Sequence, residues 1–207
     1  IDRLWRKKAI SLLKKYAPER MLDVATGTGD FAIAALKLNP HKIIGIDISE
    51  GMLELGKEKM QKKGYSNIIT LEKGDSENLH FESNTFDAIT VGFGVRNYEN
   101  LILGLSEMNR VLKKGGAIAI LEFSKPTVFP VKQLYAFYFK RILPTIGKLF
   151  SKDHRAYTYL PKSVEEFPCG KDFENILQKV GYVNTKSYKV SFGIATIYIA
   201  EKPSENH

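Results

Sequence analysis

Gly27, Gly29 and Asp47 form the pattern in this 207-residue chain that most clearly indicates a ligand-binding site. The two glycines follow the apolar stretch 21–25, which predicts a short buried strand, and they precede a helical pattern. Glycine lets a backbone turn sharply and approach a ligand closely. Asp47 ends the next predicted strand, 42–46, where its carboxylate could accept both hydroxyls of a ribose. The pattern predicts a nucleotide-binding strand–helix–strand unit.

Two cofactors fit this unit. The spacing Gly27-x-Gly29-x-x-Ala32 matches the dinucleotide fingerprint, in which a helix N-terminus binds a pyrophosphate, and it indicates NAD. Against NAD, Asp23 and Asp30 put negative charge where the pyrophosphate would lie. S-adenosylmethionine carries a sulfonium and an amino group, both cationic, which the same carboxylates would attract. Asp30 has a structural alternative as a helix N-cap, so this stretch favours S-adenosylmethionine and leaves NAD open.

Two further loops follow predicted strands and carry polar side chains. After strand 68–72, the Asp75 carboxylate could accept from an adenine amino group and the Ser76 N–H could donate to a ring nitrogen; an Asx turn is the structural alternative for Asp75. After strand 85–91 comes Gly-Phe-Gly-Val-Arg-Asn at 92–97. Ligands bind outside the carboxyl ends of the strands in open α/β sheets. We therefore expect the substrate chemistry at this second loop.

The periodicity of the chain predicts the fold that positions these loops. Helical patterns at 3–16, 49–63, 101–112 and 163–180 alternate with strand patterns, and 183–190 with 195–200 predicts a closing hairpin. In the helix that Ser49 caps and Gly64 ends, Met52, Leu53, Leu55 and Met60 are expected to face inward. We predict a Rossmann-like α/β fold: five parallel strands, each followed by a helix, and an antiparallel hairpin that completes a seven-stranded sheet.

The stretch 128–150 departs from this rhythm because it is aromatic, apolar and basic at once. We interpret it as an amphipathic helical cap inserted at 128–162 in a single domain, 1–207, that begins with a helix at 1–17. Such a cap would suit the boundary of a bilayer. Burial in the core or in a homodimer interface is the structural alternative.

Composition limits the classes of function. The chain is 43% hydrophobic with net charge +8, has a single cysteine, and carries neither a signal-peptide pattern nor an apolar run of membrane-spanning length. We expect a cytoplasmic protein without a metal, because the four histidines lack ligand spacing. The positive charge alone does not choose between nucleic acid and an anionic membrane surface. Base-modifying methyltransferases commonly carry Asn-Pro-Pro-aromatic after the fourth strand, which this chain lacks, so we predict no nucleic-acid partner and keep RNA modification as an alternative.

The oxidoreductase alternative needs a proton-relay group and a second domain or its equivalent. The Tyr-x-x-x-Lys spacing of short-chain dehydrogenases occurs once, at Tyr182 and Lys186, but on a predicted strand rather than on a helix. The predicted architecture therefore favours a methyltransferase.

Longer motifs support this assignment. The chain resembles the ubiquinone/menaquinone biosynthesis C-methyltransferases over nearly its whole length, with Lys114 where that family usually has proline. The motifs that carry the resemblance are Val-Ala-Thr-Gly-Thr-Gly-Asp at 24–30, Gly-Ile-Asp-Ile-Ser at 45–49, Gly-Phe-Gly-Val-Arg-Asn at 92–97, Arg-Val-Leu-Lys-Lys-Gly-Gly at 110–116 and Leu-Glu-Phe-Ser-Lys-Pro at 121–126.

The resemblance implies a class I methyltransferase that moves a methyl group from S-adenosylmethionine to a ring carbon of a prenylated quinol, and we lean to demethylmenaquinol over the ubiquinone-pathway benzoquinol. It implies donor contacts from Thr28, Asp47 and the Asp75–Ser76 pair, and a backbone contact at Gly92. A prenylated substrate would bring the protein to the inner membrane as a peripheral protein.

The chemistry of such a reaction suggests roles for the 92–97 loop. A quinol ring carbon becomes nucleophilic when the neighbouring hydroxyl ionises, so the enzyme must stabilise an oxyanion and assist loss of the ring proton. Arg96 is the candidate for both tasks, and Asn97 would orient the ring. An ion pair of Arg96 with Asp87 or Glu122 is the structural alternative. Secondary candidates for quinol contacts are His154, Tyr157 and Tyr159.

Overall fold

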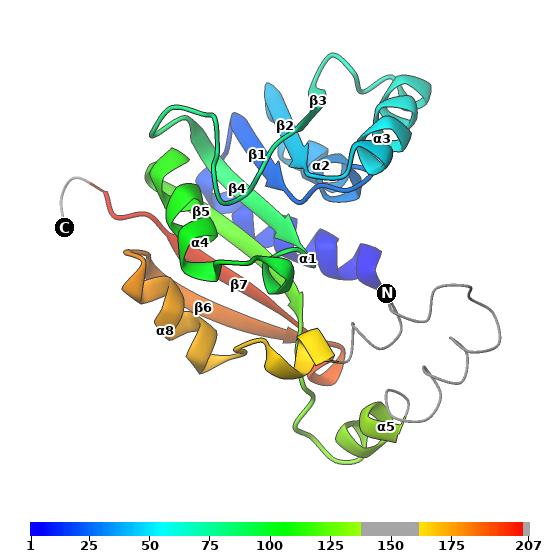
Figure 1. Ribbon diagram of the computed structural model, residues 1–207, viewed down its shortest axis with the longest axis vertical. Coiled ribbons are helices and arrows are strands. Elements are labelled where there is room, and N and C mark those ends of the chain that lie inside the picture. The colour runs from blue at the N-terminus through cyan, green and yellow to red at the C-terminus, as the bar shows by residue number, and fades with distance from the viewer. Residues whose placement is uncertain (138–161, 205–207) are drawn as a thin grey trace.

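A computed structural model describes residues 1–137 and 162–204. Its centre is a seven-stranded sheet in the order β3-β2-β1-β4-β5-β7-β6 (Figure 1). The first five strands are parallel, β7 runs antiparallel to β5, and β6 antiparallel to β7. The strands are β1 (Arg20–Val24), β2 (Lys42–Asp47), β3 (Ile69–Lys73), β4 (Phe86–Gly92), β5 (Leu112–Phe123), β6 (Val183–Val190) and β7 (Ala195–Glu201). The predicted Rossmann-like sheet with its C-terminal hairpin is confirmed.

Helices cover both faces of the sheet. Figure 1 shows α4 and α8 in front of the strands and α1 behind them. The helices are α1 (Asp2–Leu13), α2 (Asp30–Ala35), α3 (Glu50–Lys63), α4 (Leu101–Val111), α5 (Val131–Phe137) and α8 (Lys171–Lys179). In the described part of the chain, no helix is both long and apolar enough to cross a bilayer.

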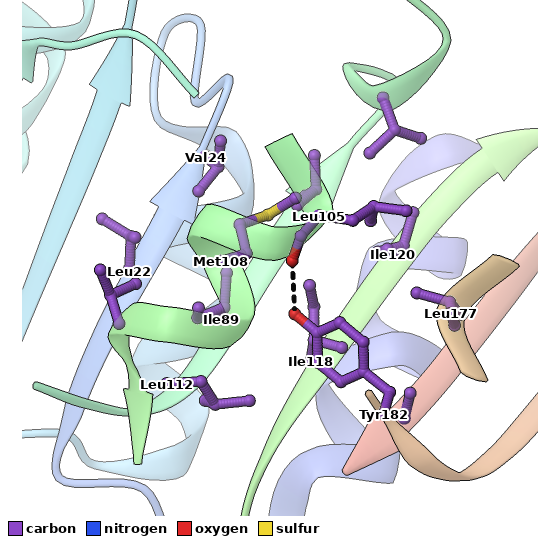
Figure 2. Close-up of a cluster of buried hydrophobic side chains, with 14 of the residues drawn as sticks. Leu22, Val24, Ile89, Leu105, Met108, Leu112, Ile118, Ile120, Leu177 and Tyr182 are labelled. Atoms are coloured by element: carbon purple, nitrogen blue, oxygen red, sulfur yellow. Dashed lines mark hydrogen bonds between the residues drawn. The ribbon is translucent and has the colours of Figure 1, made fainter. Parts of the chain in front are cut away.

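Two apolar clusters hold these layers together. On the front face, α4 and α8 pack Leu105, Met108 and Leu177 on alternate residues of β1, β4 and β5 (Figure 2). Tyr182 is buried in this cluster, and its hydroxyl donates to the Leu105 carbonyl at 3.3 Å. On the other face, residues of α1, α2 and α3 pack against the opposite side of the same strands. Strands buried on both faces explain why the stretches read as continuous apolar runs.

The helix α3 confirms its predicted ends and corrects part of its predicted inner face. The Ser49 hydroxyl accepts from the Met52 N–H, and Gly64 ends the helix with φ of 72°. Leu53 and Met60 are buried, as expected. Met52 and Leu55, predicted to face inward, are 42% and 58% exposed. The helix therefore buries a narrower stripe than its four apolar side chains suggested.

The prediction that every parallel strand precedes a helix is wrong at β3. Between β3 and β4 the chain forms a loop, and side chains of α4 satisfy its backbone instead of a helix. Arg110 donates to the carbonyls of Leu79 and Phe81, each at 2.7 Å, and the Glu107 carboxylate accepts from the Leu79 N–H at 2.9 Å. These partners lie about 30 residues away in sequence, where periodicity carries no signal.

The helix predicted at 163–180 is interrupted. A helical turn at 162–166 stops at Phe167–Gly170, and α8 starts only at Lys171. Pro168 and the positive φ of Gly170, 63°, explain the break. Of the predicted cap at 128–162, only α5 and the flanking residues belong to the described chain; 138–161 lie outside it.

Candidate active site

A cavity of about 690 Å³ opens at the carboxyl ends of β1, β2 and β4. The predicted site residues that line it are Gly27, Thr28, Asp47, Asp75, Ser76, Gly92 and Asn97. These come from four loops, each of which follows a different parallel strand. The predicted site residues span about 70 positions of the sequence, and the sheet brings them together at the carboxyl ends of its strands, as expected for an open α/β fold.

Asp47 connects the glycine loop to the second strand. One carboxylate oxygen accepts from the Gly27 N–H at 2.8 Å, and the other accepts from the Ser49 N–H at 2.9 Å. Each oxygen keeps a further lone pair for a ligand hydroxyl. Gly27 has φ of 55°, and a Cβ there would lie 3.3 Å from the Cε atom of Met52, which also lines the cavity. The positive φ favours glycine at this position, and a side chain there would crowd Met52 at the cavity wall.

Thr28 and Asp30 are held by a lysine of α3. The Lys59 ammonium donates to the Thr28 hydroxyl at 2.6 Å and lies 3.2 Å from an oxygen of Asp30. Both Thr28 and Asp30 line the cavity. Gly29, which the sequence also placed in the site, does not; it is the N-cap of α2 with φ of 80°, where a Cβ would lie 2.5 Å from the Met60 Cε atom. Its role in the structure is to let α2 and α3 approach each other.

Asp23 forms the floor of the cavity and is already satisfied by the protein. Its carboxylate accepts from the hydroxyls of Thr26 and Thr90, at 2.5 and 2.7 Å, and from the Ala32 N–H at 3.1 Å. Burial raises the pKa of Asp23 to about 6, and these three hydrogen bonds offset only part of that shift. Asp23 therefore fixes the glycine loop to β1 and β4 from below.

Asp75 and Ser76 sit opposite the glycine loop. One Asp75 oxygen accepts from the Glu77 N–H at 2.8 Å, so the Asx turn exists, and the residue lines the cavity as well. Ser76 lies close to the phenol of Tyr98, another lining residue, and burial raises the pKa of that phenol. The turn and the ligand-facing position are compatible, because a carboxylate has a second oxygen.

The loop after β4 approaches the glycine loop through two glycines. A Cβ on Gly92 would lie 2.9 Å from a ring carbon of Phe31, and a Cβ on Gly94 would lie 2.5 Å from that of Ala25. Phe93, between them, adopts a positive φ of 59°, which a non-glycine residue rarely does. This tight backbone path directs Asn97 toward the cavity.

Arg96 is turned toward the β5 strand. Its guanidinium donates to Glu122 at 2.8 Å and to the Phe93 carbonyl at 2.5 Å, and the two charged side chains are 11% and 0% exposed. Burial raises the pKa of Glu122, while the Arg96 charge works in the opposite direction. The ion pair with Glu122, weighed from sequence as the structural alternative, is present. Arg96 is not among the described residues that line the cavity, and its catalytic role stays a prediction.

Two further predictions concern the quinol contacts and the absence of a metal. His154, Tyr157 and Tyr159 lie outside the described residues, so their predicted quinol contacts stay predictions. In the part that the structure describes, no group of three or more His, Cys, Asp or Glu side chains could hold a metal ion.

Sequence reasoning missed contributors that come from distant elements. Arg6 of α1 lines the cavity, as does Tyr98, and Trp5 packs its ring near Phe93 and Phe123 with centroids 6.3 and 6.4 Å away. The helical pattern of 3–16 identified α1 but not what its cationic side chains approach. Arg6 is followed directly by the exposed Lys7 and Lys8, so the local sequence does not set it apart, and only the tertiary fold places it at the cavity.

The charge of the cavity discriminates between the two cofactors considered. Six carboxylates line it, and Arg6 is the one cationic side chain among the described lining residues; the six are Asp23, Asp30, Asp47, Asp75, Glu77 and Glu99. A dianionic pyrophosphate would meet strong repulsion there. S-adenosylmethionine carries a sulfonium and an amino group, which the carboxylates attract. Its ribose and adenine fit beside the glycine loop.

Comparisons with known proteins agree with this site. The model of the ubiE/COQ5 methyltransferase family matches residues 1–202. The demethylmenaquinone methyltransferase of Bacteroides fragilis is 51% identical over 203 residues, which cover 98% of this chain and 83% of the relative. The ubiquinone/menaquinone biosynthesis C-methyltransferase of Geobacter sulfurreducens is 46% identical over 204 residues, with 98% and 79% covered.

Solved structures agree on the fold. The [4+2]-cyclase SpnF superimposes with a TM-score of 0.70 at 16% identity and covers 96% of this chain and 81% of its own. Phosphoethanolamine N-methyltransferase 2 of Haemonchus contortus, in complex with S-adenosyl-L-methionine, gives a TM-score of 0.67 at 16% identity, with 95% and 52% covered. At this identity the likeness concerns the fold alone. The family match over nearly the full length and the half-identical relative decide the assignment: this chain belongs to the ubiE/COQ5 methyltransferase family.

Proposed function

We propose that this protein transfers a methyl group from S-adenosylmethionine to a ring carbon of a prenylated quinol, with demethylmenaquinol as the substrate. The observation that carries the donor assignment is the cavity itself, where Asp47 and the glycine loop meet under a strongly acidic lining. The substrate assignment is supported by the relative of Bacteroides fragilis, which is named demethylmenaquinone methyltransferase.

Donor binding follows from the loops at the strand ends. Asp47 accepts the two ribose hydroxyls with the lone pairs that its backbone partners leave, Asp75 and Ser76 bind the adenine edge, and Met52 covers the ring. Thr28, held by Lys59, contacts the amino-acid part of the donor. Gly92 lines the cavity and has no side chain to cover its backbone, so that backbone is available to the ligand.

The donor supplies an electrophilic methyl group on a positively charged sulfur. In the transfer the ring carbon forms a bond to the methyl carbon while the bond from methyl to sulfur breaks, and S-adenosylhomocysteine leaves as a neutral thioether. The ring then loses a proton to water and regains aromaticity. Asn97, on the cavity wall, orients the quinol hydroxyl. Arg96 lies one residue behind it and, through its ion pair with Glu122, fixes the loop and contributes positive potential toward the ionised hydroxyl.

A peripheral membrane location is supported by apolar side chains exposed near the start of the insertion. Phe129 and Leu134 are 77% and 64% exposed, and Phe192, in the turn between β6 and β7, is 74% exposed. With Lys125 and Lys132 nearby in sequence, these residues could enter the interface of an anionic bilayer. Co-sedimentation with anionic liposomes should weaken for Phe129→Ser and Phe192→Ser, and unchanged binding would remove this part of the proposal. A homodimer interface in the insertion stays a prediction.

The decisive assay incubates the protein with methyl-labelled S-adenosylmethionine and, separately, demethylmenaquinol or the ubiquinone-pathway benzoquinol, each in its reduced form. We expect the label on a ring carbon of the naphthoquinol. Label on neither quinol, with the donor bound, would refute the substrate assignment, and label on the benzoquinol alone would replace it.

A further inference from the structure

Arg6 is a residue of the cavity that none of the sequence motifs identified. It lies in the first half of α1, and its side chain is 18% exposed. Its charge is close enough to the floor of the cavity to lower the pKa of Asp23 against the larger effect of burial. Arg6 therefore lies near the floor of the cavity, together with the glycine loop.

Arg6 is the one positively charged side chain among the described residues that line an otherwise acidic cavity. The six carboxylates of the lining suit a cationic ligand, and an anionic group of that ligand would find its complementary charge at the Arg6 guanidinium. S-adenosylmethionine has one anionic group, the carboxylate of its amino-acid moiety. Guanidinium and carboxylate groups form paired, charge-assisted hydrogen bonds.

We propose that Arg6 binds the carboxylate of the donor, and so sets the end of the cavity that receives the amino-acid part. This inference rests on the proposed function, because it needs the donor to bind here. Asp23 and the glycine loop mark that end, since Asp47 and Asp75 occupy the other end.

Neighbouring contacts hold Arg6 in place. The Asp2 carboxylate, one turn earlier in α1, accepts from one terminal nitrogen of Arg6 at 2.7 Å. Trp5 anchors the helix through its ring nitrogen, which donates to the Ser191 hydroxyl at 2.9 Å. Since arginine carries five N–H donors, the contact with Asp2 leaves several of them for a ligand.

The test is a calorimetric titration of the full chain with S-adenosylhomocysteine and with its decarboxylated analogue. We compare the wild type with Arg6→Gln, and use Arg3→Gln as a matched control, because Arg3 is exposed on the same helix and does not line the cavity. The wild type and Arg3→Gln should bind the carboxylate-bearing ligand about 10- to 100-fold more tightly than the analogue. Arg6→Gln should lose most of that difference and keep its affinity for the analogue.

Other outcomes would overturn the inference in distinguishable ways. If Arg6→Gln weakens both ligands equally, Arg6 acts through the structure of α1. If it weakens neither and instead lowers kcat/KM for the quinol, Arg6 faces the acceptor. Should Arg6→Gln unfold, Arg6→Lys provides the test, because it keeps the charge and should retain part of the preference. A wild type that binds neither ligand would refute the proposed function itself.

Discussion

The two halves of the cavity are built in different ways. The donor half, after β1, β2 and β3, contains glycines and short polar side chains, and Asp47 and Asp75 each accept from a backbone N–H two residues away. The half after β4 is supported from outside the cavity by side chains that meet across the fold, such as Arg96 with Glu122 and Trp5 with Ser191. A contact within one short motif can be inferred from spacing, whereas a contact between two motifs, such as that of Arg96 with Glu122, requires the fold.

The largest expected effect tests the half after β4. Arg96→Gln would leave Glu122 buried without its cation, which should lower the free energy of unfolding by about 3 to 5 kcal/mol, and Glu122→Gln should cost a similar amount. The double variant should lose less than the sum. Urea denaturation provides the measurement, and Lys113→Gln is the control, because its pair with Asp87 is half exposed and worth under about 1 kcal/mol.

Where the variants of this pair remain folded, they should separate the two halves. We expect Arg96→Gln to bind S-adenosylhomocysteine nearly as well as the wild type and to lose quinol methylation. If donor binding fell together with turnover, the two halves would not be independent and the comparison would fail.

The second prediction concerns the floor shared by the two halves. Asp23 has a pKa of about 6 in the folded protein against an ordinary 3.8, so the folded state holds this proton more tightly than the unfolded state. As pH rises through that window, ionisation of Asp23 removes up to about 3 kcal/mol of stability, and the loss is complete above it. Asp23→Asn keeps the shape and should abolish this component.

The measurement is urea denaturation of wild type and Asp23→Asn across the range from about pH 4 to about pH 7. The variant should gain stability relative to the wild type as pH rises. Parallel curves would mean that Asp23 ionises at its ordinary pKa in the folded protein.

The third prediction tests the donor half directly. Asp47→Ala removes the acceptor of the ribose hydroxyls and of two backbone N–H groups, so the Kd for S-adenosylhomocysteine should rise about 100-fold. Asp172→Asn is the matched control, because this exposed carboxylate lies on α8. An Asp47→Ala protein that still binds the donor normally would show that the glycine loop does not form the nucleotide site.

The smallest expected effect concerns Lys59, which supports the donor half of the cavity. Lys59→Met releases Thr28 and Asp30 without removing a ligand contact, so donor affinity should fall only about 3-fold. Lys62→Met, on the same helix and paired with Glu58 at the surface, should change nothing. A loss as large as that of Asp47→Ala would make Lys59 part of the site itself.

What could be predicted from the sequence follows the same division. Strand ends, caps and glycine turns are local, so β1 to β5, the Ser49 cap and the positions of Asp47 and Asp75 were accessible from periodicity and spacing. The loop between β3 and β4 was not, because Arg110 and Glu107 satisfy its backbone from another layer. Arg6 was missed for the same reason, and the orientation of Arg96 could only be given as two alternatives.

The central claim is that the cavity is a site for a positively charged methyl donor, complete without the quinol. Isothermal titration of the full chain with S-adenosylmethionine and with NAD, in the absence of acceptor, tests it most directly. The account predicts one bound S-adenosylmethionine per chain and no binding of NAD. Binding of NAD with exclusion of S-adenosylmethionine would contradict it.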